Sequence, residues 1–561
     1  MIRVRMHIRK PSRSAESEFS RLFAVTAMAA AMLTTLATAD AAPPAAKPKP
    51  RRGGTVITAL NLEPPSLNWY LGVGASFSTS IVSDQILASA YHDSGKEARL
   101  VPDLLARDPE ITTAPFSLTY TIKKQARWSD GIPVTAHDFK FTWQVLANAK
   151  FDLLDGIREL YEPIVGAKIL GPKRVRFVFR KPYPAWKDLF APVLPWHALA
   201  GEDFDKVWKD RIDNPKTGRP IASGPFIWAS WESGSRLTLA RNAHYWGKKA
   251  YLDRLVFRFL LPDFGAQIRA VRAGEVDLIQ GQGSVPVSDL RNSAGIRVQP
   301  GSTNVWENIE FQLGAKGHPA LKRLFVRQAI AYAIDRRALT SGLYKEIAPG
   351  LKTDQSAVYV PYQRGYRPHW RIWSYSPQRA IRLLRSHGCR RGGDGIFSCQ
   401  GRRLTFRFVS TAGDALRERT FDLVQPALRR IGIELVKAFS PRQLFIATLL
   451  PQGDWDLALF AWIGGGDIGW ENVWGCKGEL NHIDYCNRRV TTLLRRASAE
   501  LRPSLRTPLV NRADALMARD LPTLPLFVKP GYVIYNSRIR NVIWNPVDVL
   551  WNAQDWWIAP P

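Results

Sequence analysis

The sequence predicts an α/β protein built from several subdomains. Short β-branched or alternating runs, typical of strands, are interleaved along the chain with amphipathic runs, typical of helices. The chain has 561 residues, which is enough for about three to four domains. Hydrophobic residues make up 45% and charged residues 23% of the chain, so a mainly disordered or collagen-like protein is excluded.

The expected strands are short apolar or alternating runs. Residues 55–60 (TVITAL) are rich in β-branched side chains and follow two glycines. Residues 117–122 and 174–180 alternate between apolar and polar side chains, which predicts strands with one buried face. Residues 255–261 and 454–460 are two further apolar runs that we expect to form strands.

Four stretches predict helices: residues 137–146, 267–273, 319–343 and 416–431. The first follows Thr135, an expected N-cap residue, with Asp138 as the acid of a capping box. The third is the strongest helical prediction, because apolar side chains share one face at Leu321, Leu324, Phe325, Ala329 and Ala333. In the fourth, Pro426 should bend or start the helix.

The N-terminus has the pattern of a secretory signal peptide. Basic residues precede an uncharged Ala/Thr/Leu-rich run, residues 22–39, which ends in the small-x-small sequence ATA. A single transmembrane anchor is the alternative, because this run is just long enough to span a bilayer. We therefore expect a signal peptide over residues 1–39 with cleavage near Ala39, a Pro-rich linker over 40–52 and a periplasmic protein.

The chain is strongly basic, with a formal net charge of +29. Six cations and two acids fall in residues 1–39, so about +25 would remain after cleavage. Residues 364–430 alone carry fifteen arginines against four acids, which indicates a solvated basic face or one attracted to anions or a membrane surface. Nucleic-acid binding is not expected, because the arginines are dispersed and no nucleic-acid-binding module is recognised.

The four cysteines form two close pairs, Cys389 with Cys399 and Cys476 with Cys486. In an exported protein the simplest reading is two local disulfides. Free or otherwise paired thiols remain an alternative, as does a metal site, although nine intervening residues are not the spacing of a zinc knuckle.

The sequence carries no motif of a serine hydrolase, a zinc protease or a nucleotide-binding loop. Asp454 and Asp456 lie two apart in an expected strand, so they should share a face on which like charges repel. A hydrolase would need two facing carboxylates, so an enzyme built on this pair is only a distant alternative. We expect no catalytic residue, no metal and no cofactor.

Eight segments appear in order along most of the chain, and their sequences are GGTVITALN with PSLN (53–61, 65–68), WSDG with PVTAHD and FT (128–131, 133–138, 141–142), SGPF (223–226), LARN (239–242), YW (245–246), AGEVD (273–277), VRQAI with AIDR (326–330, 333–336) and IGIE (431–434). Together they resemble the bacterial extracellular solute-binding proteins of family 5, the dipeptide/oligopeptide-binding components of ABC importers. The resemblance covers the chain from about Gly53 to the C-terminus.

The resemblance implies a two-lobe periplasmic-binding-protein fold, type II-like with an extra subdomain, joined by a two-strand hinge. The implied parts are lobe I (53–302, with the extra subdomain near 90–220), lobe II (303–526) and a return to lobe I (527–561). It also implies that a peptide or other small solute is enclosed between the lobes and handed to ABC importer permease subunits at the inner membrane. We expect a monomer.

The resemblance also suggests residues that contact the ligand. The loop at 72–76 matches a first-lobe loop that meets the ligand backbone in the family, so Gly74, Ala75 and Ser76 are candidates, with a simple turn as the alternative. Trp462 packs either on the ligand or in the core.

One departure from the family concerns the acid that holds a peptide's amino group shortly after a Trp of the second lobe. In the stretch WIGGGD, Gly465 takes the position of that acid, and Asp467 could replace it only with a local shift. Binding of another solute, such as a sugar, a metal chelate or an opine-like compound, therefore becomes an alternative. The rival function is an exported, chaperone-like binding protein that is attracted to anionic surfaces.

Overall fold

The computed structural model describes residues 49–74, 76–154, 156–260, 264–282, 290, 293–344, 348, 350–464 and 469–560. Pro50–Pro561 form one structural unit. The predicted signal peptide and most of the predicted linker lie outside the described residues, as do Ala75, Gly465 and Asp467. In the described part of the chain, no helix is both long enough and apolar enough to cross a membrane.

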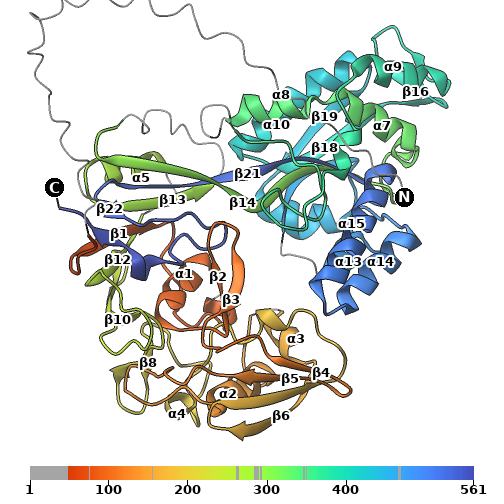
Figure 1. The fold of residues 1–561 in the computed structure, drawn as a ribbon. Helices are drawn as coiled ribbons and strands as arrows, with labels where there is room; N and C mark the ends of the chain where they lie inside the picture. Colours follow the sequence, from red (N-terminus) through yellow and green to blue (C-terminus); the bar gives the residue numbers. More distant parts are fainter. Residues whose placement is uncertain are drawn as a thin grey trace, which may run out of the picture. The chain divides into compact units, whose positions relative to one another are not determined.

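Ten strands form one mixed sheet (Figure 1). Its order is β10 (Phe226–Glu232), β11 (Arg236–Arg241), β12 (Arg254–Phe259), β1 (Thr55–Leu60), β13 (Leu278–Gln282), β21 (Thr523–Asn536), β14 (Ile296–Phe311), β20 (Leu457–Ile463), β18 (Thr405–Thr411) and β19 (Glu434–Ser440). The strands expected from local patterns at 55–60 and 255–261 are β1 and β12, of which the second ends at Phe259.

Two long strands, β14 and β21, connect the two halves of this sheet (Figure 1). They pair antiparallel from Ile296 to Glu310, with register shifts between Ser302 and Trp306 and again after Glu307. The C-terminal half of β21 also pairs with β13, whereas the C-terminal half of β14 pairs with β20. Each strand is therefore shared by both halves, and the predicted two-strand hinge is confirmed.

The buried side chains form two hydrophobic clusters, one in each lobe. Lobe I is the cluster drawn mainly from residues 56–257 and 533–556. Lobe II is the cluster drawn mainly from residues 306–528, to which side chains of α5 and β13 also contribute. The chain thus returns to lobe I after β21, and the two-lobe fold is confirmed. The boundaries expected from the sequence stay a prediction.

Helices flank both halves of the sheet, and the main ones are α1 (Phe77–Ile86), α5 (Phe264–Arg272), α9 (Pro377–Ser386), α10 (Ala415–Arg430), α13 (Trp470–Trp474), α14 (Arg488–Ala499) and α15 (Pro503–Asp520). Within the region expected as the extra subdomain, a separate sheet has the order β4 (Glu110–Thr113), β5 (Phe116–Thr121), β7 (Arg174–Phe179) and β6 (Ile164–Gly171). Helix α2 (Ala136–Leu146) contacts β6 and β7. Its predicted capping box is confirmed, because Thr135 N donates to Asp138 Oδ2 at 2.6 Å.

The long helix expected over 319–343 is wrong. The chain forms three shorter elements instead: η3 (Pro319–Lys322), α7 (Leu324–Ala333) and α8 (Arg336–Tyr344). Asp335 Oδ1 accepts hydrogen bonds from two backbone N–H groups, at 3.1 and 3.0 Å, and so caps the start of α8. In α10, Pro426 lies inside the helix and does not start it.

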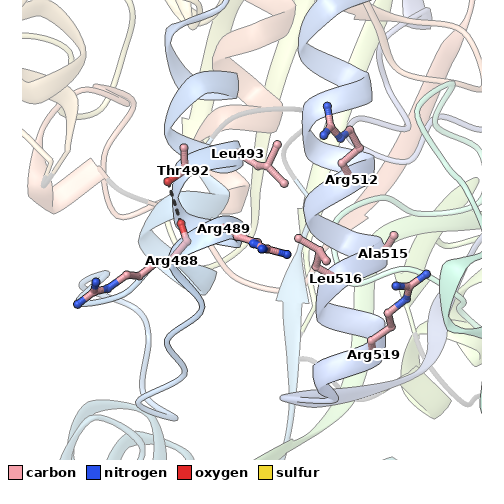
Figure 2. Close-up of a pocket in the computed structure, with 8 residues that line it drawn as sticks. All are labelled: Arg488, Arg489, Thr492, Leu493, Arg512, Ala515, Leu516 and Arg519. Atoms are coloured by element: carbon pink, nitrogen blue, oxygen red, sulfur yellow. Dashed lines mark hydrogen bonds between the residues drawn. The ribbon is translucent and has the colours of Figure 1, made fainter.

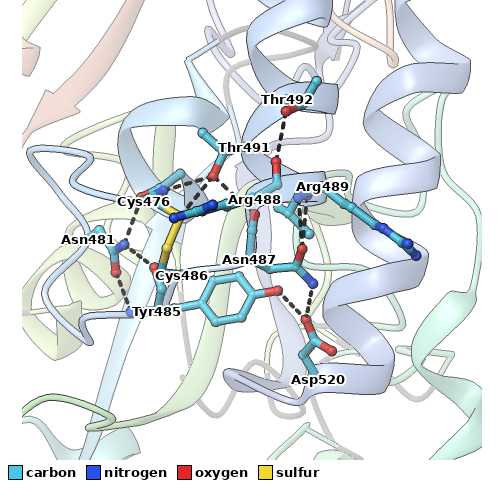
Figure 3. The surroundings of a disulfide bond; sticks show 12 residues. Cys476, Asn481, Tyr485, Cys486, Asn487, Arg488, Arg489, Thr491, Thr492 and Asp520 are labelled. Carbon is cyan, nitrogen blue, oxygen red and sulfur yellow. Dashed lines mark hydrogen bonds between the residues drawn. A yellow bond between two sulfur atoms is a disulfide. The ribbon is translucent and has the colours of Figure 1, made fainter.

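Both local disulfides expected from the sequence are formed. The sulfur atoms of Cys389 and Cys399 are 1.98 Å apart, and those of Cys476 and Cys486 are 2.08 Å apart. Figure 3 shows the second bond, which closes the turn before α14. Asn481 braces that turn from inside by donating to the carbonyl groups of Gly475 and Tyr485 at 2.8 and 2.7 Å.

Candidate ligand cleft

The two hinge strands are joined by a buried ion network where they cross between the lobes. Glu307 on β14 is fully buried, and its Oε1 lies 2.7 Å from Lys529 Nζ on β21 and 3.3 Å from Arg417 Nη2 on α10. Thr303 Oγ1 donates to the Lys529 carbonyl at 2.8 Å, beside the first register shift. Buried charges require such partners, so this network sets the geometry of the crossover.

Trp462 lies near the end of β20, beside this crossover. Its indole N–H donates to Glu310 Oε1 at 2.8 Å, and its ring packs edge to face with Phe460 and Trp474. The side chain is only partly buried. Trp462 is therefore anchored in lobe II while part of its surface stays accessible, and ligand contact by Trp462 stays a prediction.

Glu310, the partner of Trp462, is almost completely buried. Burial raises the pKa of Glu310 to about 8, although the indole hydrogen bond opposes the shift. Glu310 is thus mainly uncharged at neutral pH, because a lone carboxylate is costly to bury. No local sequence pattern indicates that this group is special.

The segment that carries Gly465 and Asp467 begins at Gly464, next to the hinge. Gly464 N donates to the Asn304 carbonyl at 2.7 Å, and Asn304 Nδ2 donates back to the Gly464 carbonyl at 3.2 Å. This pair of bonds joins the end of β20 to the crossing part of β14. Gly465 and Asp467 lie outside the described residues, so their roles stay predictions.

The candidate loop of lobe I is a single 3₁₀ turn, Gly72–Gly74, ahead of α1. A Cβ on Gly74 would lie 1.9 Å from the Asn68 carbonyl oxygen, so the close backbone approach requires glycine. Ser76 is the N-cap of α1, and its Oγ accepts from Thr79 N at 3.0 Å. Local structure thus accounts for both residues. No hydrogen bond or ring contact links the described part of this loop to Trp462.

A cavity of about 350 Å³ lies at the carboxyl ends of the neighbouring strands β1 and β13, where α/β proteins commonly bind ligands. Its lining includes Asn61, Phe77, Gln280, Gly281, Trp544 and Asn545. The Trp544 ring packs over Gly301 and Gly531, where an added Cβ would lie 2.1 Å from the ring. Sequence reasoning missed Trp544, and the available signal was one glycine in each of the two hinge strands.

A second concave site lies on lobe II, between α14 and α15 (Figure 2). Leu493, Ala515 and Leu516 form an apolar floor, and the arginines Arg488, Arg489, Arg512 and Arg519 line its edges. The cavity measures about 540 Å³. Its chemistry suits an anionic group attached to an apolar body.

The carboxylate pair expected in a strand at 454–460 is arranged differently from the prediction. Strand β20 starts at Leu457, so Asp454 and Asp456 precede it. Arg407 Nη1 lies 2.7 Å from Asp454 Oδ1, and Arg407 Nε lies 3.3 Å from Asp456 Oδ2. The expected repulsion is therefore offset by a shared guanidinium, and the pair stabilises the turn before β20.

Comparisons with known proteins agree with this fold. The family model described as bacterial extracellular solute-binding proteins, family 5 Middle, matches residues 99–479. The oligopeptide-binding protein OppA of Mycobacterium tuberculosis is 27% identical over 517 residues, which cover 87% of this chain and 82% of that protein.

Two solved structures share the fold. The structure of the periplasmic EDTA-binding protein EppA has a TM-score of 0.77 at 22% identity and covers 92% of this chain and 98% of its own. That of the oligopeptide-binding protein AppA of Bacillus subtilis, in complex with a nonapeptide, has a TM-score of 0.68 at 20% identity and covers 91% and 100%. With the family match over most of its length, this chain belongs to family 5 of the bacterial extracellular solute-binding proteins, the substrate-binding components of ABC importers.

Proposed function

We propose that this protein captures a peptide or peptide-like solute between its two lobes and delivers it unchanged to an ABC importer. The observation that carries the proposal is the pair of hinge strands, β14 and β21, shared by both lobes. A relative that is 27% identical to this chain is named for oligopeptide binding, and one structural neighbour was solved with a nonapeptide.

A hinge of this kind gives a simple binding mechanism. If the closed form binds the solute better than the open form, the solute shifts the population toward closure. Peptide main-chain groups can be held by hydrogen bonds that resemble an added strand, which do not depend on side-chain identity. This mechanism requires no bond to be made or broken in the solute.

The finer assignments belong to the same proposal. The pattern over residues 1–39 supports export to the periplasm with cleavage near Ala39. The partners would be permease subunits at the inner membrane, and the protein would act as a monomer. Gly74, Ala75, Ser76, Trp462, Gly465 and Asp467 are proposed to lie along the ligand.

The test is ligand-induced stabilisation of the purified protein with a panel of di- to nonapeptides. A true ligand at 100 times its Kd should raise the free energy of unfolding by about 2.7 kcal/mol. Small-angle scattering should show compaction with the same ligand. Absence of both effects across peptides, sugars and chelates would contradict solute capture.

The arginine-lined groove between α14 and α15 favours a second candidate, a binding protein attracted to anionic surfaces. That function predicts binding to vesicles containing anionic lipid, weakened by salt and by Arg489→Gln/Arg512→Gln. Capture of a small solute without vesicle binding would exclude it.

A further inference from the structure

A separate cavity of about 370 Å³ lies within lobe I and is lined by carboxylates. It forms where α1 and the hairpin of β2 (Tyr91–Ser94) and β3 (Arg99–Pro102) meet residues 187–191 and the C-terminal stretch 547–554. We call it the acidic chamber, and its carboxylates are Asp84, Asp93, Asp103, Asp188 and Asp548. This concentration of negative charge is notable in a chain whose net charge is +29.

The chamber wall is held by local structure. Asn545 Oδ1 accepts from Val547 N and Asp548 N at 2.8 and 3.0 Å, and Asn545 Nδ2 donates to the Gly95 carbonyl at 2.9 Å. These bonds place Asp548 and tie the C-terminal stretch to the β2–β3 hairpin. Asp103 is placed by a hydrogen bond from Ser89 N at 3.2 Å.

The chamber is lined by more acidic than basic side chains. The charges of Lys123 and Arg506 also act on Asp103 and Asp188, although neither residue lines the chamber. Lys187 lines it, but its Nζ lies 3.6 Å from Asp108, which is not one of the lining residues. The imidazole of His92, which also lines the chamber, has Nδ1 3.9 Å from Asp103 Oδ1. Within the described residues, the side chains of Asp84, Asp93 and Asp188 have no hydrogen bond or ion pair.

The pKa values of the chamber's carboxyl groups are raised, because these groups are desolvated and lie close together. Desolvation by the chamber walls raises the pKa of Asp84 above its usual range, and the charges of Asp548 and Asp93 raise it further. Burial also raises the pKa of Asp548 to about 7, with Asp93 adding to the shift. The same two causes act on Asp93, where burial and Asp188 raise the pKa to about 6. Like charges at short range account for the second contribution.

A second, independent polar group of the chamber is Gln85, the neighbour of Asp84 on α1. Gln85 lines the chamber and is only 3% exposed. Among the described residues, its side-chain amide has no hydrogen-bond partner. A buried amide without a partner is unfavourable, so this amide is available to bond a polar group that enters the chamber.

We propose that the acidic chamber holds an organic cation, an ammonium or guanidinium group carried by the solute that this protein captures. Tyr245 and Trp551 provide aromatic wall on which such a cation can pack. The volume lies in the range of small-molecule sites. Among the described residues, no three His, Cys, Asp or Glu side chains, those of the chamber included, are arranged so that they could hold one metal ion, which favours an organic cation.

The inference rests on the proposed function and narrows its substrate class. In the alignment expected from the sequence, Gly465 takes the position of the lobe II acid unless Asp467 replaces it after a local shift, and the proposed chamber would supply carboxylates from lobe I. The chamber also lies near lobe II, because the pKa of Tyr362 is raised by burial and then by the charge of Asp93. A basic side chain of a peptide and a free polyamine share the required chemistry.

Calorimetric titration with three probes tests the proposal: the tripeptide Ala-Arg-Ala, its uncharged isostere Ala-citrulline-Ala, and spermidine. The wild-type protein should bind at least one cationic probe at least 10-fold more tightly than Ala-citrulline-Ala. The double variant Asp84→Asn/Asp93→Asn should lose that preference and keep its affinity for the uncharged tripeptide. Gln85→Leu should weaken the cationic probe by several-fold. The control Asp422→Asn removes an exposed charge on α10 and should change nothing.

The outcomes separate this inference from the proposed function. Binding of both tripeptides with equal affinity, or an arginine preference that survives the double variant, would overturn the chamber while leaving solute capture intact. If spermidine binds, if its binding is lost in the double variant Asp84→Asn/Asp93→Asn, and if neither tripeptide binds, the chamber would be supported and peptide capture rejected. If Ala-Arg-Ala is preferred, if the double variant loses this preference, and if spermidine does not bind, the cation is supplied by a peptide side chain. A thermal melt of each variant checks that it is folded.

Discussion

The crossover and the acidic chamber both contain carboxylates, but only those of the crossover are paired with cations. At the crossover, Glu307 is fully buried and contacts Lys529 and Arg417. In the chamber, Asp84 and Asp93 have neither an ion pair nor a side-chain hydrogen bond within the described residues. A paired charge holds two strands together, whereas unpaired like charges leave repulsion that a cationic guest can relieve.

Glu310 represents a third arrangement, only three residues from Glu307 on β14. It has one hydrogen-bond donor, the Trp462 indole, and burial keeps it mainly uncharged at neutral pH. Neighbouring carboxyl groups of one strand thus differ in charge because their partners differ. Glu307, Glu310 and the chamber's aspartates can be distinguished by replacing each carboxyl group in turn with an amide.

The largest expected effect is the pH dependence that Glu310 causes. Its pKa is about 8 in the folded protein and near 4.5 when unfolded, so this group lowers the free energy of unfolding as pH rises from 4.5 to 8. Glu310→Gln should therefore remove a decrease of about 4 kcal/mol between pH 5 and pH 9. Urea unfolding of both proteins at the two pH values measures it. Equal slopes with pH in wild type and variant would show that Glu310 is ionised in the fold.

The next effect concerns the paired acid. Glu307→Gln keeps the shape of the side chain but leaves Lys529 and Arg417 buried near a neutral group, which should lower the free energy of unfolding by about 3 kcal/mol. Urea unfolding at pH 7 measures this loss. In a double-mutant cycle, Glu307→Gln/Lys529→Met should be less destabilised than the sum of the single variants. Strict additivity would mean that the ion pair contributes nothing to the crossover.

Elements with local signals were predictable from the sequence. The β-branched run of β1 and the capping box at Thr135 depend on residues within a few positions of each other. The break between α7 and α8 was not predictable, because the apolar spacing continues through Asp335 and only the cap reveals the end of the helix. The family resemblance supplied the hinge, which no local pattern shows.

The candidate site divides in the same way. Trp462 and the turn at Gly74 could be named from their positions in the family, but their contacts with Glu310 and Asn68 come from the fold. The acidic chamber could not be predicted at all. Asp84 and Asp548 are separated by most of the chain, and neither lies in a motif. Only the return of the C-terminal stretch to lobe I brings them to one cavity.

The smallest expected effect is an increase in the free energy of unfolding, whereas most mutations lower it. Asp84→Asn removes one of several like charges, so it should raise the free energy of unfolding of the ligand-free protein at pH 8. Because solvent that reaches the Asp84 carboxyl group screens these charges, the gain should be only about 1 kcal/mol. Asp422→Asn, the exposed control on α10, should change stability by less than about 0.5 kcal/mol. A loss of stability in Asp84→Asn would mean that an attractive partner holds this carboxylate, and the contrast with the crossover would then disappear.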